Sequence, residues 1–199
     1  MATLSAKNTK KIQRQVVRGN AFKKEVRRII EKEFSQLHKE FLATFDNHPV
    51  TLEIKGGPSS SNISRTLSGT GNLFTYIGFN EGSDPITPLR ELLQTYEIKY
   101  HPKQESLRVN IDVPSKEKVF ASTPLPWATG RSWTRGIERG ISGLGQYLVK
   151  SAKIRKSKSG HAIQVKGRVR AGKFSNIQYM SALLNDYYKK IKKLENKIF

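Results

Sequence analysis

The sequence has 199 residues and no cysteine. Disulfides, thiolate nucleophiles and cysteine-based zinc sites are therefore excluded, and we expect a reducing compartment such as the cytoplasm. The opening MATLSAKNTKKIQRQ lacks the apolar run of a signal peptide, and no stretch of about 18 uncharged apolar residues occurs anywhere. We therefore expect neither export nor a membrane span.

Side chains suited to catalysis or metal binding are also scarce. The four histidines are scattered, and none forms an HExxH motif or a pair at ligand spacing. The glycine-rich SGTGN at 68–72 lacks the pattern of a phosphate-binding loop. We predict no catalytic residue, no metal site, no cofactor and no small-molecule substrate, which leaves an enzyme as the weakest of three functional classes.

Acidic residues are few and unevenly placed. The chain has 36 Lys and Arg against 16 Asp and Glu, a formal net charge of +20. Residues 131–199 carry 17 of these basic side chains but only three acidic ones, with none between Glu138 and Asp186. Such a field must be met by counterions or by an anionic partner. Nucleic acid is the obvious candidate, whereas a membrane surface is disfavoured because the cations are not gathered on one amphipathic helix.

Apolar periodicity predicts one α+β core domain at 20–174, preceded by a basic arm at 1–19 and followed by a C-terminal helix at 175–199. The arm is expected to be poorly ordered or a frayed helix. A long helix is expected from Asn20, its N-cap, to the dipeptide His48–Pro49. An antiparallel sheet of about four to six strands completes the core.

The predicted sheet draws on several short stretches. Strands are expected at VTLEIK (50–55), NLFTYIGF (72–79), YEIKY (96–100) and LRVNIDV (107–113), and the last two form a hairpin. A short helix is expected at DPITPLRELLQ (84–94), opened by Pro85 or Pro88. Residues 56–71, GGPSSSNISRTLSGTG, have too few apolar side chains to order themselves, so we expect a long assembly loop there.

The C-terminal helix is expected to begin at a capping box formed by Ser175 and Gln178. Its apolar positions are spaced alternately by three and four, as in a heptad repeat. They are Ile177, Met180, Leu184, Tyr187, Ile191, Leu194 and Ile198. This heptad seam would pack on the protein's own sheet or on an adjacent subunit.

Residues 150–173 are predicted to form a basic hairpin that turns near Ser159–Gly160. In AIQVKGRVR the apolar and cationic side chains alternate, so a strand would present cations about 6.6 Å apart on one face. The predicted contact residues are Lys153, Arg155, Lys156, Lys158, Lys166, Arg168, Arg170 and Lys173. Nucleic acid, bound without sequence preference, and an acidic protein are equally favoured as partners, and a solvated face is the remaining alternative.

The stretch GRSWTRGIERGISGLGQYL at 130–148 has helical apolar spacing but contains five glycines. On a helix, Gly136, Gly140 and Gly143 would form a stripe beside the apolar stripe of Trp133 and Ile137. Each interior glycine costs about 0.5–1 kcal/mol relative to alanine, so the stripe indicates close approach of another backbone. We predict that these five residues form an assembly interface. The alternative is that the last glycines end the helix early.

Three stretches, GNLFTYIGF (71–79), the following DPITPLRELL, and LPWATGRSWTRGIERGISGLGQYL (125–148), resemble parts of virion structural proteins of tailed bacteriophages, of the neck, head–tail connector or tail-completion type. The resemblance implies an α+β fold with a long N-terminal helix, an antiparallel sheet and packing helices. It also implies a non-enzymatic, homo-oligomeric ring around the DNA channel of the virion neck, assembled in the host cytoplasm. The implied partners are further copies of itself and the portal or connector and tail proteins, with channel DNA as a further candidate.

The high positive charge departs from what we would assume for such a ring, so the position within the neck stays open. A sequence-independent nucleic-acid-binding protein of ribosomal or packaging type is the main alternative, because it shares the excess of cations. An enzyme would instead require an acidic or histidine pair that converges in a pocket.

Overall fold

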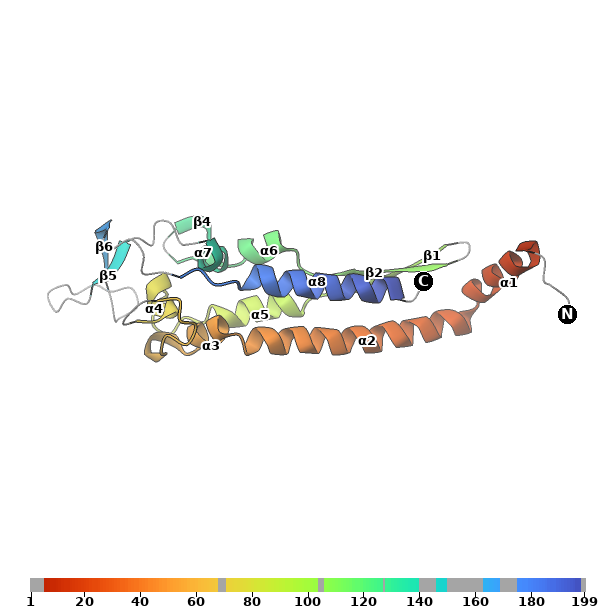
Figure 1. Ribbon diagram of the computed structural model, residues 1–199, viewed down its shortest axis with the longest axis horizontal. Helices are drawn as coiled ribbons and strands as arrows, with labels where there is room; N and C mark the ends of the chain where they lie inside the picture. Colours follow the sequence, from red (N-terminus) through yellow and green to blue (C-terminus); the bar gives the residue numbers. More distant parts are fainter. Residues whose placement is uncertain are drawn as a thin grey trace. The chain divides into compact units, whose positions relative to one another are not determined.

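The computed structural model describes residues 6–67, 71–103, 106–126, 128–139, 146–149, 163–168 and 175–197. Within these ranges the chain forms eight α-helices, one 3-10 turn and six strands (Figure 1). The strands pair as three separate two-stranded antiparallel ladders. The predicted α+β class, the long N-terminal helix and the C-terminal helix are confirmed, whereas the prediction of one continuous sheet is wrong.

The chain divides into two units, each assembled from segments distant in sequence. The first comprises Met1–Phe41, Thr95–Val113 and Asn185–Phe199. The second comprises Leu42–Gln94 and Pro114–Leu184.

The first unit begins with helix α1 (Ala6–Arg18), followed by α2 (Asn20–Asp46). Gly19 lies between the two helices. Its N–H donates to the carbonyl oxygens of Gln15 and Val16 at the end of α1, and its carbonyl accepts the N–H of Lys23 in α2. Asn20 is thus the first helical residue, and the prediction that it is the N-cap is wrong. The basic arm is helical from Ala6 because its spacing of Lys and Arg between apolar residues suits a helix.

A hairpin of β1 (Glu97–Pro102) and β2 (Leu107–Asp112) belongs to the same unit, and its register runs from Glu97 opposite Asp112 to Pro102 opposite Leu107. The hairpin predicted from the strands at 96–100 and 107–113 is confirmed, and Leu107, Val109 and Ile111 are buried along β2. The Ile111 N–H donates to Glu195 Oε1 of helix α8 (Met180–Lys197) at 2.9 Å, which fastens the hairpin to that helix.

Aromatic side chains form the core between α2 and α8 in the first unit. The rings of Phe41 and Tyr187 stack at 4.1 Å, and His38 Nδ1 lies 2.7 Å from the Tyr187 hydroxyl. Burial raises the pKa of Tyr187, so its hydroxyl stays protonated. The seam of α8 is confirmed, since a single chain buries Met180, Leu184, Tyr187, Ile191 and Leu194. Ile177 lies half-buried before the helix, and Ile198 falls outside the described residues.

Helix α8 begins at Met180, so the predicted capping box at Ser175 and Gln178 is wrong. Instead, the Tyr179 carbonyl accepts the N–H of Leu183, and the Glu138 carboxylate accepts the N–H and hydroxyl of Ser181. A carboxylate from a residue distant in sequence thus caps this helix. Negative charge at a helix N-terminus is stabilising.

In the second unit, α3 (Pro49–Lys55) replaces the strand predicted at VTLEIK, a prediction that is wrong. His48 Nδ1 accepts the Val50 N–H at 3.2 Å, and Pro49 occupies the first helical position, so the sequence supplies a cap and a start. The buried positions 50, 51, 53 and 54 follow a helical period, whereas Leu52 is exposed. Strict alternation of V-L-I therefore misled the prediction.

Helix α4 (Leu73–Ile77) likewise replaces the strand predicted at NLFTYIGF. The stretch is buried as expected, but the side chain of Asn72 accepts the Thr75 N–H at 3.0 Å and Gly78 closes the helix in the left-handed conformation. The helix predicted at 84–94 is confirmed as α5 (Ile86–Gln94), with Asp84 Oδ1 accepting the N–H groups of Ile86 and Thr87.

The segment after α3 contains the 3-10 turn η1 (Gly57–Ser59) and is ordered by two buried polar side chains. The Glu53 carboxyl group accepts the N–H groups of Ser64 and Leu73, each at 2.7 Å. Asn72 Nδ2 donates to the carbonyl oxygens of Pro58 at 2.9 Å and Ser60 at 2.7 Å. The expectation that 56–71 cannot order itself is thus wrong for its described residues, because polar anchors replace apolar burial.

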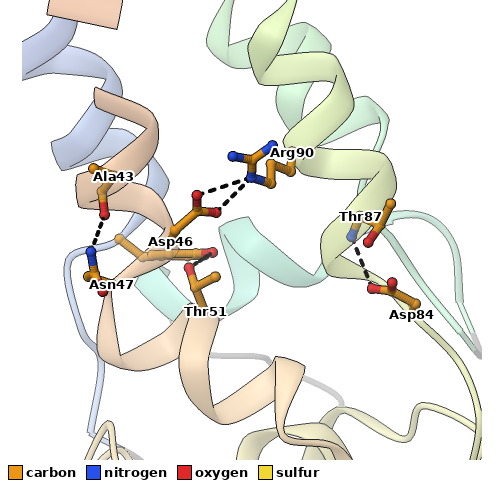
Figure 2. A network of polar contacts seen from close by, with 8 residues as sticks. Ala43, Asp46, Asn47, Thr51, Asp84, Thr87 and Arg90 are labelled. Atoms are coloured by element: carbon orange, nitrogen blue, oxygen red, sulfur yellow. Dashed lines mark hydrogen bonds and ion pairs between the residues drawn. The ribbon is translucent and has the colours of Figure 1, made fainter. Parts of the chain in front are cut away.

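Polar contacts within the second unit also connect α2 to α5, and α3 to the residue before α8 (Figure 2). Arg90 Nε of α5 donates to both carboxylate oxygens of Asp46, at 2.9 and 3.1 Å. The Thr51 hydroxyl of α3 pairs with that of Tyr179 at 2.8 Å. These contacts complement an apolar core in which the Trp133 ring meets Phe79 edge-on, at a centroid distance of 5.8 Å.

Candidate anion-binding groove

The stretch predicted as one helix at 130–148 contains three different elements, so that prediction is wrong. Residues Ala128–Ser132 form strand β4, Trp133–Arg139 form helix α7, and Gln146–Val149 form strand β5. Only Gly136 of the predicted glycine stripe lies on α7, while Gly140 and Gly143 fall outside the described residues.

The structure also reassigns the apolar members of the predicted assembly interface. Trp133 is 1 % exposed and Ile137 is 0 % exposed within the single chain. Both side chains therefore belong to the core of the second unit and are not presented to a neighbour. Gly136 is half-buried and lies at the surface of α7.

The predicted basic hairpin is correct for one strand and wrong for its partner. Residues Ile163–Arg168 form β6, which contains Lys166 and Arg168. Its antiparallel partner is β5, with Gln146 opposite Arg168 and Val149 opposite Ile163, rather than the residues just before 159. The other predicted contact residues fall outside the described ranges; they are Lys153, Arg155, Lys156, Lys158, Arg170 and Lys173.

A groove of about 880 Å³ lies beside α7 in the second unit. It is bounded by α6 (Lys116–Ala121), by the ladder of β3 (Pro124–Leu125) with β4, and by α7. Its basic lining residues are Lys116, Arg131, Arg135 and Arg139. Its apolar lining residues are Phe120, Ala121, Pro124 and Leu125. The groove therefore combines a cationic wall with an apolar surface.

Three mutually bonded hydroxyl groups fix the junction between the groove's walls. The side-chain oxygens of Thr123, Ser132 and Thr134 form a triangle with each edge 2.8 Å. Trp133 N–H also donates to the Thr123 carbonyl at 2.8 Å, which ties the end of α6 to the start of α7. Because this network is largely buried, it holds the two walls in a defined arrangement.

Arg135 is held at the groove by two contacts. Its guanidinium carbon lies 5.5 Å from the centre of the Phe120 ring, within the range of a cation–π interaction. Its backbone N–H donates to Ser132 Oγ at 3.2 Å. The guanidinium is thereby positioned on the groove wall, and one face of the ring is covered by it.

The carboxylates near the groove do not cancel its positive charge. Glu117 is exposed, and its pKa is lowered by hydrogen bonds from its own backbone amide and from Ser115, then by the charges of Lys116 and Arg135. It therefore stays ionised as one negative charge among four positive ones. Glu138 of α7 is engaged with Ser181 at the start of α8.

The groove's cations are not among the contact residues predicted from the sequence. Arg131, Arg135 and Arg139 recur every fourth residue, which is a visible signal for a shared helical face. The preceding segment turned out to be a strand, but the three side chains still line one groove. Lys116 comes from a distant helix, and no local pattern could have grouped it with the arginines.

Other site types lack support in the described part of the chain. No group of three or more His, Asp or Glu side chains there could hold a metal ion. Among the described helices, none combines the length and apolar character needed to cross a membrane. Among the described residues that line the groove there is one glutamate and no histidine.

A scan against protein-family models and searches of the curated proteins and of the solved structures found no match. The resemblance to tailed-phage virion proteins therefore stays a prediction that depends on the quoted sequence stretches, and the groove's chemistry must be argued from its own residues.

Proposed function

We propose that the protein is a non-enzymatic assembly subunit of a tailed-bacteriophage particle, of the neck or tail-completion type. It would form a homo-oligomeric ring that joins the head, through the portal or connector, to the tail around the DNA channel. In this role the groove beside α7 is a contact surface for an anionic neighbour.

One observation carries this proposal. The stretch from Leu125 to Arg139, which belongs to the resemblance, also supplies three of the four cations in the described lining of the groove and part of its apolar lining. A buried hydroxyl network holds these elements in place, as a recognition surface requires if binding is not to cost much ordering entropy. Part of the stretch that resembles virion proteins thus lines a preformed surface.

Mass measurement under native conditions tests the proposal directly. The purified protein is measured alone and after mixing with a candidate portal, connector or tail protein. We expect either a closed ring of defined stoichiometry or a stable complex with one of these partners. A monodisperse monomer that forms no complex with any of these proteins would contradict the proposal.

A sequence-independent nucleic-acid-binding protein is the second candidate. It is favoured by the absence of any acidic residue between Glu138 and Asp186 and by the two cations of β6. With about five phosphate contacts, log K against log salt would fall with a slope of about −4 to −5. A monomer that binds bare DNA with this slope and forms no ring would favour this candidate.

A further inference from the structure

We propose that the groove beside α7 binds an acidic segment of another protein that also contributes bulky apolar side chains. The inference rests on the proposed assembly role and names the chemistry of the partner at that site. It follows from the way cations and apolar side chains share one preformed surface.

The charge of the groove selects an anionic ligand. Four cations come from α6, β4 and α7, and Glu117 is the single carboxylate in the described lining. Two or more carboxylates on a bound segment would pair with Lys116 and the arginines. Because the arginines are exposed, these pairs should weaken as the salt concentration rises.

The apolar lining distinguishes an acidic protein segment from nucleic acid. Phe120 and Pro124 offer apolar surface that a sugar–phosphate backbone cannot use, whereas Leu or Phe side chains of a peptide would bury against it. Phe120, the one aromatic ring among the described lining residues, has Arg135 over its face, so this ring is poorly placed to stack with an unpaired base.

Helix α6 contains a matched pair of lysines for the test. Lys116 lines the groove, while Lys118, two residues later, is exposed and does not line it. Replacing either lysine by glutamine removes the same charge from the same helix. A difference between the two variants therefore reports on the groove and not on the net charge of the protein.

The assay is fluorescence anisotropy with a fluorescein-labelled peptide, Glu-Leu-Glu-Asp-Leu-Glu, added to the full chain at physiological ionic strength. Two comparison probes are the same peptide with both leucines replaced by serine and a short single-stranded DNA of equal net charge. We expect the leucine peptide to bind about tenfold more tightly than the serine peptide, because only the former buries apolar surface. We expect the DNA to be a weak competitor.

The variants then locate the site. Lys116→Gln and Arg139→Gln should each raise the Kd of the leucine peptide by about three- to tenfold, while Lys118→Gln should change it by less than about twofold. Gly136→Leu places a bulky side chain at the groove wall and should abolish binding. Urea unfolding of each variant tests whether it is folded. If Gly136→Leu does not fold, Arg139→Gln provides the test of the groove in its place.

Several results would overturn the inference: equal affinity for the two peptides, DNA that binds as tightly as the leucine peptide, equal effects of Lys116→Gln and Lys118→Gln, or no binding at all. These outcomes are distinct from failure of the assembly role. A ring or portal complex that survives Lys116→Gln and Gly136→Leu would overturn the groove's assignment and leave the proposed function standing. Peptide binding that depends on the groove, in a protein that forms no ring or portal complex, would overturn the proposed function and leave the groove's assignment standing.

Discussion

Replacement of Glu53 by alanine should severely destabilise the second unit. The Glu53 side chain is fully buried, and its two oxygens accept the N–H groups of Ser64 and Leu73, each at 2.7 Å. These amides belong to segments 11 and 20 residues further along the chain, so one carboxyl group fixes both ends of the intervening loop. Alanine would leave both amides buried without this acceptor.

The size of the effect follows from those two amides. An unsatisfied buried donor costs about 1–3 kcal/mol, so we expect Glu53→Ala to lower the free energy of unfolding by about 2–6 kcal/mol. That is a large fraction of the total of about 5–15 kcal/mol for a typical domain. Glu53→Gln keeps one acceptor but points an amide N–H₂ toward the other donor, so it should also be destabilising.

Urea unfolding followed by circular dichroism measures the loss, and hydrogen exchange of the Ser64 and Leu73 amides reports on the loop itself. Glu91→Ala is the matched control, because Glu91 is exposed on α5. It should change stability by less than about 0.5 kcal/mol. If Glu53→Ala lost no more than Glu91→Ala, or if the two amides stayed equally protected, polar anchoring of the loop would be refuted.

Three further predictions concern single contacts. Burial lowers the pKa of His48, so the unfolded state takes up a proton at a higher pH than the folded state does. Stability should therefore fall as the pH drops through about 6.5, the ordinary histidine value. Urea unfolding at several pH values should show a smaller fall for His48→Asn, which keeps a capping oxygen. Tyr187→Phe removes the hydroxyl bonded to His38 and should cost about 1–2 kcal/mol in the same assay, and no loss would show that this bond is dispensable. Arg90→Gln should cost less than about 1 kcal/mol and less still at high salt, because Arg90 and Asp46 are 38 % and 37 % exposed; a loss that salt does not reduce would contradict a screened surface pair.

The hairpin at 97–112 and the C-terminal helix were predictable because their patterns are long. The alternation along the six residues of β2 excludes a helix there. The seam of five buried positions along α8, spaced by three and four residues, excludes a strand. The start of α8 was not predictable, since Glu138, 43 residues earlier, provides its capping carboxylate. A capping box read from nearby residues cannot detect such a partner.

The two strands predicted at 50–55 and 72–79 failed for a common reason. Over so few residues an apolar run fits a strand and a buried helix equally well, and the deciding signals lie at the ends. Pro49 after His48 and Asn72 three residues before Thr75 are helix-start signals, and Gly78 is a helix-end signal. Giving these flanking residues more weight than the alternation would have predicted both helices correctly.

Helix α7 shows why the predicted assembly interface included two residues, Trp133 and Ile137, that belong to the core. Trp133 and Ile137 are four residues apart and fill the core, so the opposite side of a seven-residue helix must face outward. Arg135, Gly136 and Arg139 line the groove from there. Glycine at 136 adds no side chain between the two arginines, which leaves the cations accessible along the wall. The chemistry of this surface therefore depends on the arginines beside Gly136, whereas the apolar side chains of α7 stabilise the fold.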